Sequence, residues 1–265
     1  MGAEQTHGAA LRLCRRLGAA VFRLWSGPPD GSSRGRPSRP EVPVEREANA
    51  ARPAQRSFFI LDNQSKSTHA RQIILASASP RRRELLASLG ANFVVEPSLS
   101  GEDVPADWEP ARIVEELALR KARSVLARRS GAGVIVGSDT IVVLEGAVLG
   151  KPDDAQDAVR MLDMLQGREH LVYTGVACID EASGREDVRH GSTRVRMKAL
   201  SRRRIEDYVK SGEPMDKAGA YAIQGLGALL VDSIEGDYFT VVGLPLALLG
   251  EMLEGFGIGL MPSNP

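Results

Sequence analysis

The chain has 265 residues, of which 43% are hydrophobic and 26% are charged, enough to bury the core of one large domain or of two small ones. The formal net charge is zero, yet residues 1–70 carry 11 of the 34 basic and 6 of the 34 acidic side chains, which leaves 23 basic and 28 acidic residues in the rest. A mildly acidic folded part argues against a general nucleic-acid binder, and no apolar run approaches the roughly 18 residues of a membrane span. We therefore expect neither a nucleic acid nor a membrane as partner.

The first 70 residues form a region of their own. They are rich in Arg, Pro, Gly, Ser and Ala, and residues 27–56 show no sustained period, which predicts a disordered N-terminal extension before a folded domain at 71–265. Residues 9–25 interleave apolar residues with arginines and resemble an organellar transit peptide, although a basic tail on a cytosolic protein is an equally good interpretation. The two cysteines, Cys14 and Cys178, lie far apart, which indicates a reducing compartment. We predict a cytoplasmic location, with the mitochondrion or a plastid as the alternative.

From Gln72 onward, apolar strands and amphipathic helices alternate, which predicts an α/β domain. In chain order, the expected strands are 72–76, 91–95, 134–136, 141–144, 147–149, 170–179, 188–197, 226–231 and 238–242. The expected helices run from Pro80 to Gly90, from 109 to 129, from Asp153 or Asp154 to Gly167, from Ser201 to Lys210, and from Pro245 onward.

The segment 75–86 places hydroxyls and arginines where a strand runs into a helix. Ser77 and Ser79 follow the strand, Ser79 is a natural N-cap, and Arg81 and Arg82 lie in the first turn. The free N–H groups and dipole of a helix start favour an anion, and guanidinium groups offer bidentate contacts to phosphate. An ordinary capped helix with a solvated basic first turn is the alternative, but basic residues at a helix N-terminus oppose the dipole. The segment therefore predicts a phosphate site.

Two charged residues fall in apolar surroundings. Lys121 lies in the middle of the apolar stripe of the helix 109–129, where it is either a lysine that snorkels from the edge of the core or an anion ligand that reaches into a cleft. Asp139 stands in the segment 137–140 between two β-branched runs, and a buried carboxylate there is either tied to backbone N–H groups or used in chemistry. Both residues are candidates for the same site.

The residue types favour hydrolysis at phosphorus with a hard cation. The sequence has no cysteine or serine nucleophile with a plausible histidine base, and it lacks the GxxxxGK[ST], GxGxxG and kinase motifs. Glu102 and Asp139 could hold Mg²⁺ or Mn²⁺ with waters, and Asp139 is our choice of general base. Arginines, lysines and a metal supply the positioning and charge stabilisation that attack on phosphorus needs.

Four segments in the right order resemble the motifs of the Maf family. They are LASASPRRRELL at 75–86, GSDT at 137–140, GKP at 150–152 and DKAGAYAIQG at 216–225, and the match covers about residues 72–255. The resemblance implies an α/β fold with an elongated mixed sheet flanked by helices and two lobes around a cleft, related to inosine triphosphate pyrophosphatases. It also implies metal-dependent hydrolysis of nucleoside triphosphates to monophosphates and pyrophosphate.

The resemblance also implies residue roles. It makes Asp139 the proton acceptor and Glu102 the metal-side glutamate, although the loop around Glu102 is the weakest part of the match. With the anion site above, the predicted catalytic residues are Asp139, Glu102 and Lys151, the predicted metal ligands are Asp139 and Glu102, and the predicted substrate-binding residues are Ser77, Ser79, Arg81, Arg82, Lys121, Thr140 and Gln224.

Three positions separate the branches of the family, and here they hold Arg81, Thr140 and Gln224. This combination is similar to the branch that acts on dTTP, UTP and their modified forms, and a glutamine amide has both the donor and the acceptor that a uracil or thymine edge requires. The resulting prediction is a house-cleaning pyrophosphatase that uses Mg²⁺, Mn²⁺ or Co²⁺, with a homodimer implied by the resemblance alone. Two alternatives stay open: a nucleotide-binding regulator of cell division with little turnover, and a pyrophosphatase that prefers non-standard purine triphosphates.

Overall fold

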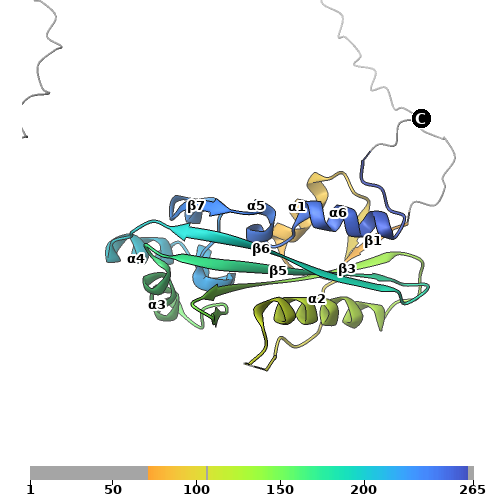
Figure 1. The fold of residues 1–265 in the computed structure, drawn as a ribbon, viewed down its shortest axis with the longest axis horizontal. Coiled ribbons are helices and arrows are strands. Elements are labelled where there is room, and N and C mark those ends of the chain that lie inside the picture. Colours follow the sequence, from red (N-terminus) through yellow and green to blue (C-terminus); the bar gives the residue numbers. More distant parts are fainter. Residues whose placement is uncertain (1–70, 106, 262–265) are drawn as a thin grey trace, which may run out of the picture. The chain divides into compact units, whose positions relative to one another are not determined.

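The computed structural model describes residues 71–105 and 107–261, so the predicted extension at 1–70 lies outside the described residues (Figure 1). The strands are β1 (Ile73–Leu75), β2 (Phe93–Val95), β3 (Val134–Leu144), β4 (Ala147–Leu149), β5 (Glu169–Asp180), β6 (Glu186–Met197) and β7 (Val231–Glu235). The helices are α1 (Pro80–Ser88), α2 (Pro110–Leu126), α3 (Ala155–Leu165), α4 (Arg202–Lys210), α5 (Tyr238–Val242) and α6 (Leu246–Gly255), with 3₁₀ turns η1 (Glu213–Asp216), η2 (Ala218–Ala220) and η3 (Gly225–Leu229). None of the helices in the described part of the chain is long and apolar enough to cross a membrane.

The strands form one mixed sheet, which confirms the predicted α/β class. Their order is β2-β1-β3-β5-β6-β7, and β4 pairs with β3 beside this path. β1 is parallel to both β2 and β3, whereas the pairs β3–β5, β5–β6 and β6–β7 are antiparallel. The long antiparallel strands β3 and β5 therefore form the centre of the sheet, with the short parallel strands on one side.

The strand prediction is wrong in type or extent at three places. The runs 134–136 and 141–144 belong to the single strand β3, because the segment between them stays in register with β5. Residues 226–229 lie in η3 because the Glu213 carboxylate accepts the N–H groups of Leu226 and Gly227, each at 2.9 Å, and folds the segment back. The third is 238–242, which is the helix α5, capped by Asp237 through a 2.6 Å bond from the Thr240 N–H.

One edge of β3 is left open in its middle. β1 pairs with Val134–Val136 and then ends, while β4 pairs only with Val142–Leu144. Residues 137–141 are therefore hydrogen-bonded to β5 on one side and meet no strand on the other. The chain leaving β1 runs past this gap into α1, so the segment 76–82 lies next to it.

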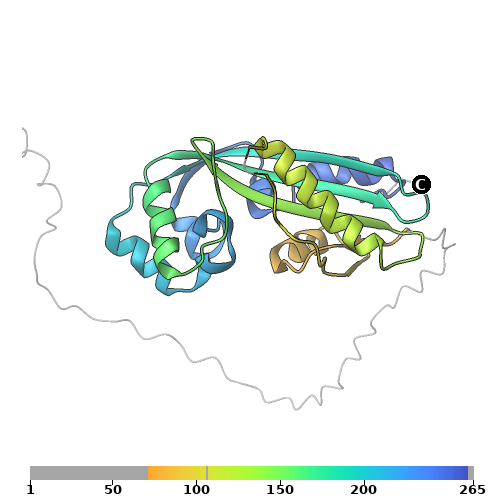
Figure 2. The ribbon, with the colours of Figure 1, turned by 90° about the horizontal axis from the view of Figure 1, so that it is seen from below.

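Helix α2 lies against the face of β3 and β5, as Figure 2 shows from below. Two glycines permit this close approach. A Cβ atom at Gly137 would lie 2.1 Å from the Ala118 carbonyl oxygen, and one at Gly175 would lie 2.1 Å from the Val114 carbonyl oxygen. Both distances are far inside van der Waals contact, so any side chain there would push the helix away.

The buried apolar residues form separate clusters along the sheet. One surrounds α3 and α4, with Leu162, Leu165 and Ile205 fully buried. Another lies under α1 and α6, with Leu86 and Leu249 fully buried. The long strands run through both regions, as predicted for two lobes on one sheet, and the gap beside β3 lies where the regions meet.

Candidate active site

A cavity of about 1020 Å³ opens at the gap beside β3. Its walls come from the segment 76–82, the loop before α2, α2 itself, the middle of β3, the segment 146–151 and the loop 215–224. All ten predicted site residues line this one cavity: Ser77, Ser79, Arg81, Arg82, Glu102, Lys121, Asp139, Thr140, Lys151 and Gln224. The structure thus brings together residues that are up to 147 positions apart in the chain, while the role of each one stays a prediction.

Asp139 and Lys121 form a buried ion pair in the cavity wall. Gly137 and Asp139 lie on the same face of β3, and Lys121 is three residues beyond Ala118 on α2, so the close approach at Gly137 places the ammonium at the carboxylate. Each side chain is only 11% exposed. A buried pair compensates two charges that would each be costly alone. Of the two interpretations of Lys121, the structure therefore contradicts a lysine snorkelling to solvent.

Glu102 joins this pair from the loop before α2. Its carboxylate accepts from Lys121 Nζ at 2.8 Å and lies 3.7 Å from Lys151 Nζ. The hydrogen bond from Lys121 is the largest cause that lowers the pKa of Glu102, against a smaller opposing effect of burial. Lys151, on the segment after β4, is more than half exposed and faces the cavity from the other end of the gap. Two carboxylates and two ammonium groups thus meet at one place.

The start of α1 forms another wall, with one departure from the predicted capping. Ser79 occupies the N-cap position, but its side chain makes no capping hydrogen bond. Instead the Ser77 hydroxyl accepts the Ser79 N–H at 3.2 Å and also an N–H of Arg82 at 3.4 Å. Ser77, two positions before the N-cap, forms the local side-chain to backbone hydrogen bond, since a serine hydroxyl can accept the N–H of the residue two positions on. Ser79 Oγ is therefore left to the cavity rather than to the helix.

Arg82 is held from several sides. Its Nε donates to the Gly243 carbonyl at 2.7 Å, and its Nη2 donates to the Thr140 hydroxyl at 3.1 Å. Burial is the main cause that lowers the pKa of this guanidinium, and the neighbouring Asp139 carboxylate opposes that shift. Arg81 is less confined, since it makes a 3.3 Å ion pair with Asp216, whose side chain is 63% exposed. The first turn of α1 therefore presents one fixed and one adjustable guanidinium.

Gln224 reaches the cavity from the loop that carries η2. In this loop Gly219 has φ +68°, and its N–H donates to the Gly150 carbonyl at 2.9 Å, which ties the loop to the segment that bears Lys151. A Cβ atom on Gly219 would also lie 3.0 Å from Val142 on β3. Gln224 is half-buried, and its amide makes no hydrogen bond with another residue of the described chain. An amide in that position is free to contact a ligand.

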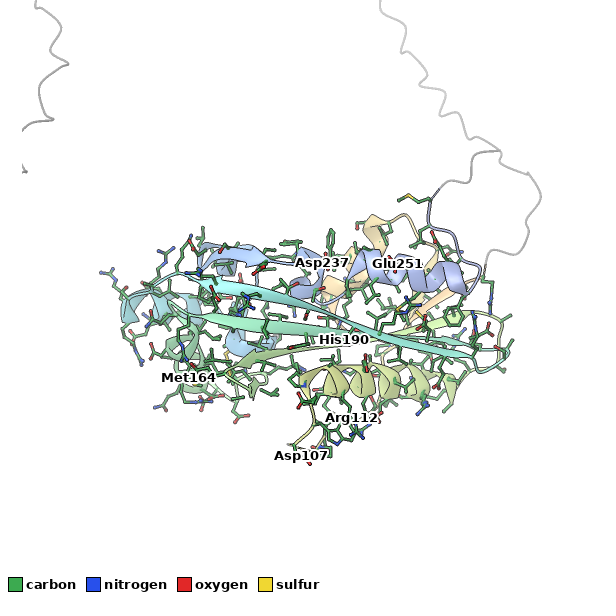
Figure 3. The ribbon with its side chains drawn as sticks, in the orientation of Figure 1. Asp107, Arg112, Met164, His190, Asp237 and Glu251 are labelled. Carbon is green, nitrogen blue, oxygen red and sulfur yellow. The ribbon has the colours of Figure 1, made fainter. Side chains whose placement is uncertain are left out.

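The cavity also contains residues that the sequence analysis did not single out. Trp108 lines it, and the Arg112 guanidinium stacks on the indole 3.9 Å from the ring centroid; Figure 3 shows Arg112 at the start of α2. Ser100 lines it with a buried hydroxyl that has no partner among the described residues. Lys217 could have been found from the sequence, because it follows Asp216 in the DKAGAYAIQG motif. Trp108 and Ser100 lie in the loop 97–109, where no period or motif marks them.

The acidic groups suit a divalent cation only in part. Glu102 and Asp139 contact the same ammonium, so both can approach a cation at that place, and carboxylate oxygens are the ligands that Mg²⁺ and Mn²⁺ prefer. No group of three metal-ligating side chains occurs within residues 71–105 and 107–261. This donor set fits a metal held by two carboxylates and completed by waters and substrate phosphates, the usual arrangement for Mg²⁺.

Comparison with known proteins identifies the family of this chain. Residues 72–256 match the family model for Maf-like proteins. A dTTP/UTP pyrophosphatase of Moorella thermoacetica is 56% identical over 187 residues, which cover 71% of this chain and 96% of the relative. One of Symbiobacterium thermophilum is 54% identical over 187 residues, which cover 70% and 94%.

Among solved structures, the Staphylococcus aureus Ham1 protein aligns with 70% of this chain and 100% of its own, at 11% identity and a TM-score of 0.44. That score is too low to support an assignment, which therefore depends on the sequence matches. The family model spans well over half of the chain, and the relatives are matched over nearly their full lengths. The chain belongs to the Maf family.

Proposed function

We propose that this protein hydrolyses dTTP, UTP and modified pyrimidine triphosphates to the nucleoside monophosphate and pyrophosphate. The observation that carries the proposal is the buried ion pair of Asp139 and Lys121, joined by the half-exposed Glu102, in the same cavity as the arginines of α1. The family's pyrophosphatase members support the reaction type, since relatives at 54–56% identity are named dTTP/UTP pyrophosphatases. Removal of damaged or excess nucleotides is the cellular role we propose.

The positive groups of the cavity bind the triphosphate in this proposal. Arg81 and Lys151 are exposed enough to move onto phosphate oxygens, and Arg82 offers fixed N–H groups. A guanidinium contacts two phosphate oxygens at once, and an ammonium adds a point charge. The start of α1 adds the backbone N–H groups of Arg81 and Arg82, which have no acceptor within the helix and favour an anion. The triphosphate thus lies along the gap beside β3.

Asp139 accepts the proton of the attacking water. The water oxygen forms a bond to the α-phosphorus, the bond from that phosphorus to the bridging oxygen breaks, and pyrophosphate leaves with the bonding electrons. Asp139 holds the proton, and Lys121 stabilises the carboxylate in its reactive orientation. A divalent cation, when bound by Glu102 and Asp139, supplies charge neutralisation for the triphosphate. Positioning and charge compensation of this kind are the main requirements for transfer at phosphorus.

Gln224 selects the base in this proposal. Its amide can donate to a pyrimidine carbonyl and accept from the N3–H group of uracil or thymine. Thr140 acts differently, since its hydroxyl already contacts Arg82 and therefore influences a phosphate ligand. We also propose a homodimer and a cytoplasmic location, which size-exclusion chromatography with light scattering and imaging of the tagged protein can test.

The test is pyrophosphate release by the purified full-length chain. dTTP, UTP, CTP, 5-methyl-UTP, inosine triphosphate and 7-methyl-GTP are compared with Mg²⁺, Mn²⁺ or Co²⁺ and with chelator. We expect the highest kcat/KM on dTTP and UTP and no turnover in chelator. Equal or higher values on the purine nucleotides would contradict the substrate assignment, and nucleotide binding without turnover under every metal would contradict the enzymatic proposal.

A further inference from the structure

A chain of buried hydroxyls extends from Arg82 away from the cavity. Thr140 on β3 and Thr174 on β5 are direct cross-strand partners, and their hydroxyl oxygens lie 2.9 Å apart. The Thr174 hydroxyl lies 2.7 Å from the carbonyl oxygen of Thr240 in α5. Thr174 is fully buried and does not line the cavity, so it cannot touch a substrate there.

The number of hydroxyl hydrogens fixes the direction of donation along this series of hydrogen bonds. A carbonyl can only accept, so the single hydrogen of the Thr174 hydroxyl goes to Thr240. The hydrogen between the two threonines must then come from Thr140. The Thr140 oxygen is left as an acceptor, which is what the Nη2–H of Arg82 requires at 3.1 Å. The order of donation is therefore Arg82 to Thr140, Thr140 to Thr174, and Thr174 to the backbone of α5.

The end of this hydrogen-bond series that lies farthest from Arg82 is held in place at α5. Asp237 caps α5 and accepts both the N–H and the hydroxyl of Thr240, at 2.6 and 2.7 Å, and Figure 3 labels Asp237 beside α5. Directly after α5, the Gly243 carbonyl accepts from Arg82 Nε at 2.7 Å and from the Ser138 hydroxyl at 3.0 Å. The same short helix thus supplies both the direct and the relayed acceptor for one guanidinium.

The N–H groups of Arg82 that remain without an acceptor indicate what this hydrogen-bond series does. A guanidinium has five N–H donors, and Arg82 commits one to Gly243, one to Ser77 and one to Thr140. The other two, one on each terminal nitrogen, have no acceptor within the described part of the chain, and Arg82 lines the cavity. Because the guanidinium is planar and rigid, fixing three donors fixes the direction of the other two.

We propose that Thr174 is a positioning residue for the triphosphate: through Thr140 it orients Arg82 so that two guanidinium N–H groups face the phosphate-binding part of the cavity. This inference rests on the proposed function, since it assigns the support for one of its phosphate ligands. Thr174 makes no contact with the substrate, and its effect passes entirely through Arg82. It gives α5 a direct influence on substrate binding.

The test uses the full-length chain with dTTP and five variants. Thr174→Val removes the hydroxyl at nearly constant shape, and Thr174→Ser restores it. Thr193→Val is the matched control, because Thr193 is also buried and its hydroxyl donates to a backbone carbonyl at the same helix, that of Asp237 at 2.9 Å, but makes no hydrogen bond with Arg82, Thr140 or Thr174. Arg82→Lys, alone and combined with Thr174→Val, measures the coupling between the two positions.

Arg82 contacts the triphosphate before and during the reaction, so its misorientation raises KM about tenfold and leaves kcat within about threefold. Thr174→Ser and Thr193→Val stay within about twofold of wild type, and in the Arg82→Lys background Thr174→Val adds less than about twofold. If the valine variant does not fold, Thr174→Ala carries the same comparison. A wild-type KM in Thr174→Val, an equal loss in Thr193→Val, or full additivity with Arg82→Lys would overturn the inference. Absence of turnover in the wild type would instead refute the proposed function, and the inference with it.

Discussion

Replacing Asp139 by Asn removes the proposed proton acceptor and keeps its size. A positioned general base contributes roughly 10²- to 10⁴-fold to a rate, so kcat on dTTP should fall by that range. Asn adds no bulk at a position that is only 8% exposed, so the cavity keeps its shape. The proposed triphosphate ligands on α1 are unchanged, and the variant should therefore bind dTTP about as well as the wild type.

Asp139→Asn should also lower the free energy of unfolding, and the structure limits the size of this loss. Removing one partner of a buried ion pair typically costs about 3–5 kcal/mol because the other charge is left uncompensated. Here Lys121 keeps Glu102 at 2.8 Å, and that carboxylate is about half exposed, so we expect a smaller loss of about 1–3 kcal/mol. For a domain of this size, each kcal/mol corresponds to a fall in Tm of roughly 2–4 °C.

Asp180→Asn is the matched control. Asp180 is likewise a buried carboxylate, 7% exposed, paired with an arginine, Arg71, but it lies at the far end of β5 and does not line the cavity. Steady-state kinetics, dTTP titration and urea unfolding are measured on both variants. Asp139→Asn should lose turnover and keep affinity, while Asp180→Asn should lose only stability. A folded Asp139→Asn protein with more than about a tenth of the wild-type kcat would refute the assignment of the base.

Three further predictions use the same measurements. Lys121→Met leaves the Asp139 carboxylate buried without its cation, so unfolding free energy should fall by about 3–5 kcal/mol, and a loss below about 1 kcal/mol in urea would show that the pair is not buried in solution. Gln224→Glu removes the amide donor and adds negative charge, so kcat/KM on dTTP should fall at least about tenfold, and an unchanged dTTP-to-CTP ratio would exclude a role in base selection. Arg71 lowers the pKa of Asp180 from 3.8 to about 2, so this pair stabilises the fold above pH 3.8 and the contribution is lost as the pH falls through about 2; Asp180→Asn should flatten the acid limb of the stability profile, and an identical limb would contradict this.

The sequence predicts those parts of the site where a local rule decides the structure. The strand that leads into Ser79 and Pro80, and the glycine-rich loop 216–225, follow from capping and backbone rules and lie where expected. Lys121 and Asp139 were recognisable as charges in apolar surroundings, which are costly without a partner. The pattern did not show that each is the partner of the other, because that contact depends on the packing of α2 against β3.

Two of the three failures have tertiary causes. The segment 137–140 looks like a break between two strands, since Gly and Asp are poor strand formers, but ten consecutive residues of β3 pair with β5 and override the local preference. Residues 238–242 have strand composition, and the Asp237 cap makes them a helix. Residue 226 and its neighbours are held by Glu213, thirteen positions earlier. For 137–140 and 226–229 a contact distant in the sequence decides the structure, whereas the Asp237 cap is a local signal that the strand composition of 238–242 outweighed in the prediction.

The four residues 137–140 show why these contacts matter to the site. Gly137 and Asp139 face α2, where the missing Cβ of the first allows the helix to bring Lys121 to the second. Ser138 and Thr140 face the opposite side, where their hydroxyls contact the Gly243 carbonyl and Arg82. Because successive side chains of β3 point to opposite faces, this one strand contributes residues to both the carboxylate side and the guanidinium side of the cavity.

This arrangement makes the register of β3 against β5 a requirement for the site. Asp139 pairs with Gly175, and Thr140 pairs with Thr174. A slip of one residue would turn the Asp139 carboxylate toward the side of Arg82 and the Thr140 hydroxyl toward α2, because successive side chains point to opposite faces. It would also place a side chain other than hydrogen under Val114, where the helix backbone leaves no room at Gly175. The same two glycines that permit the close approach of α2 therefore fix the register that separates the proposed general base from the proposed phosphate ligands.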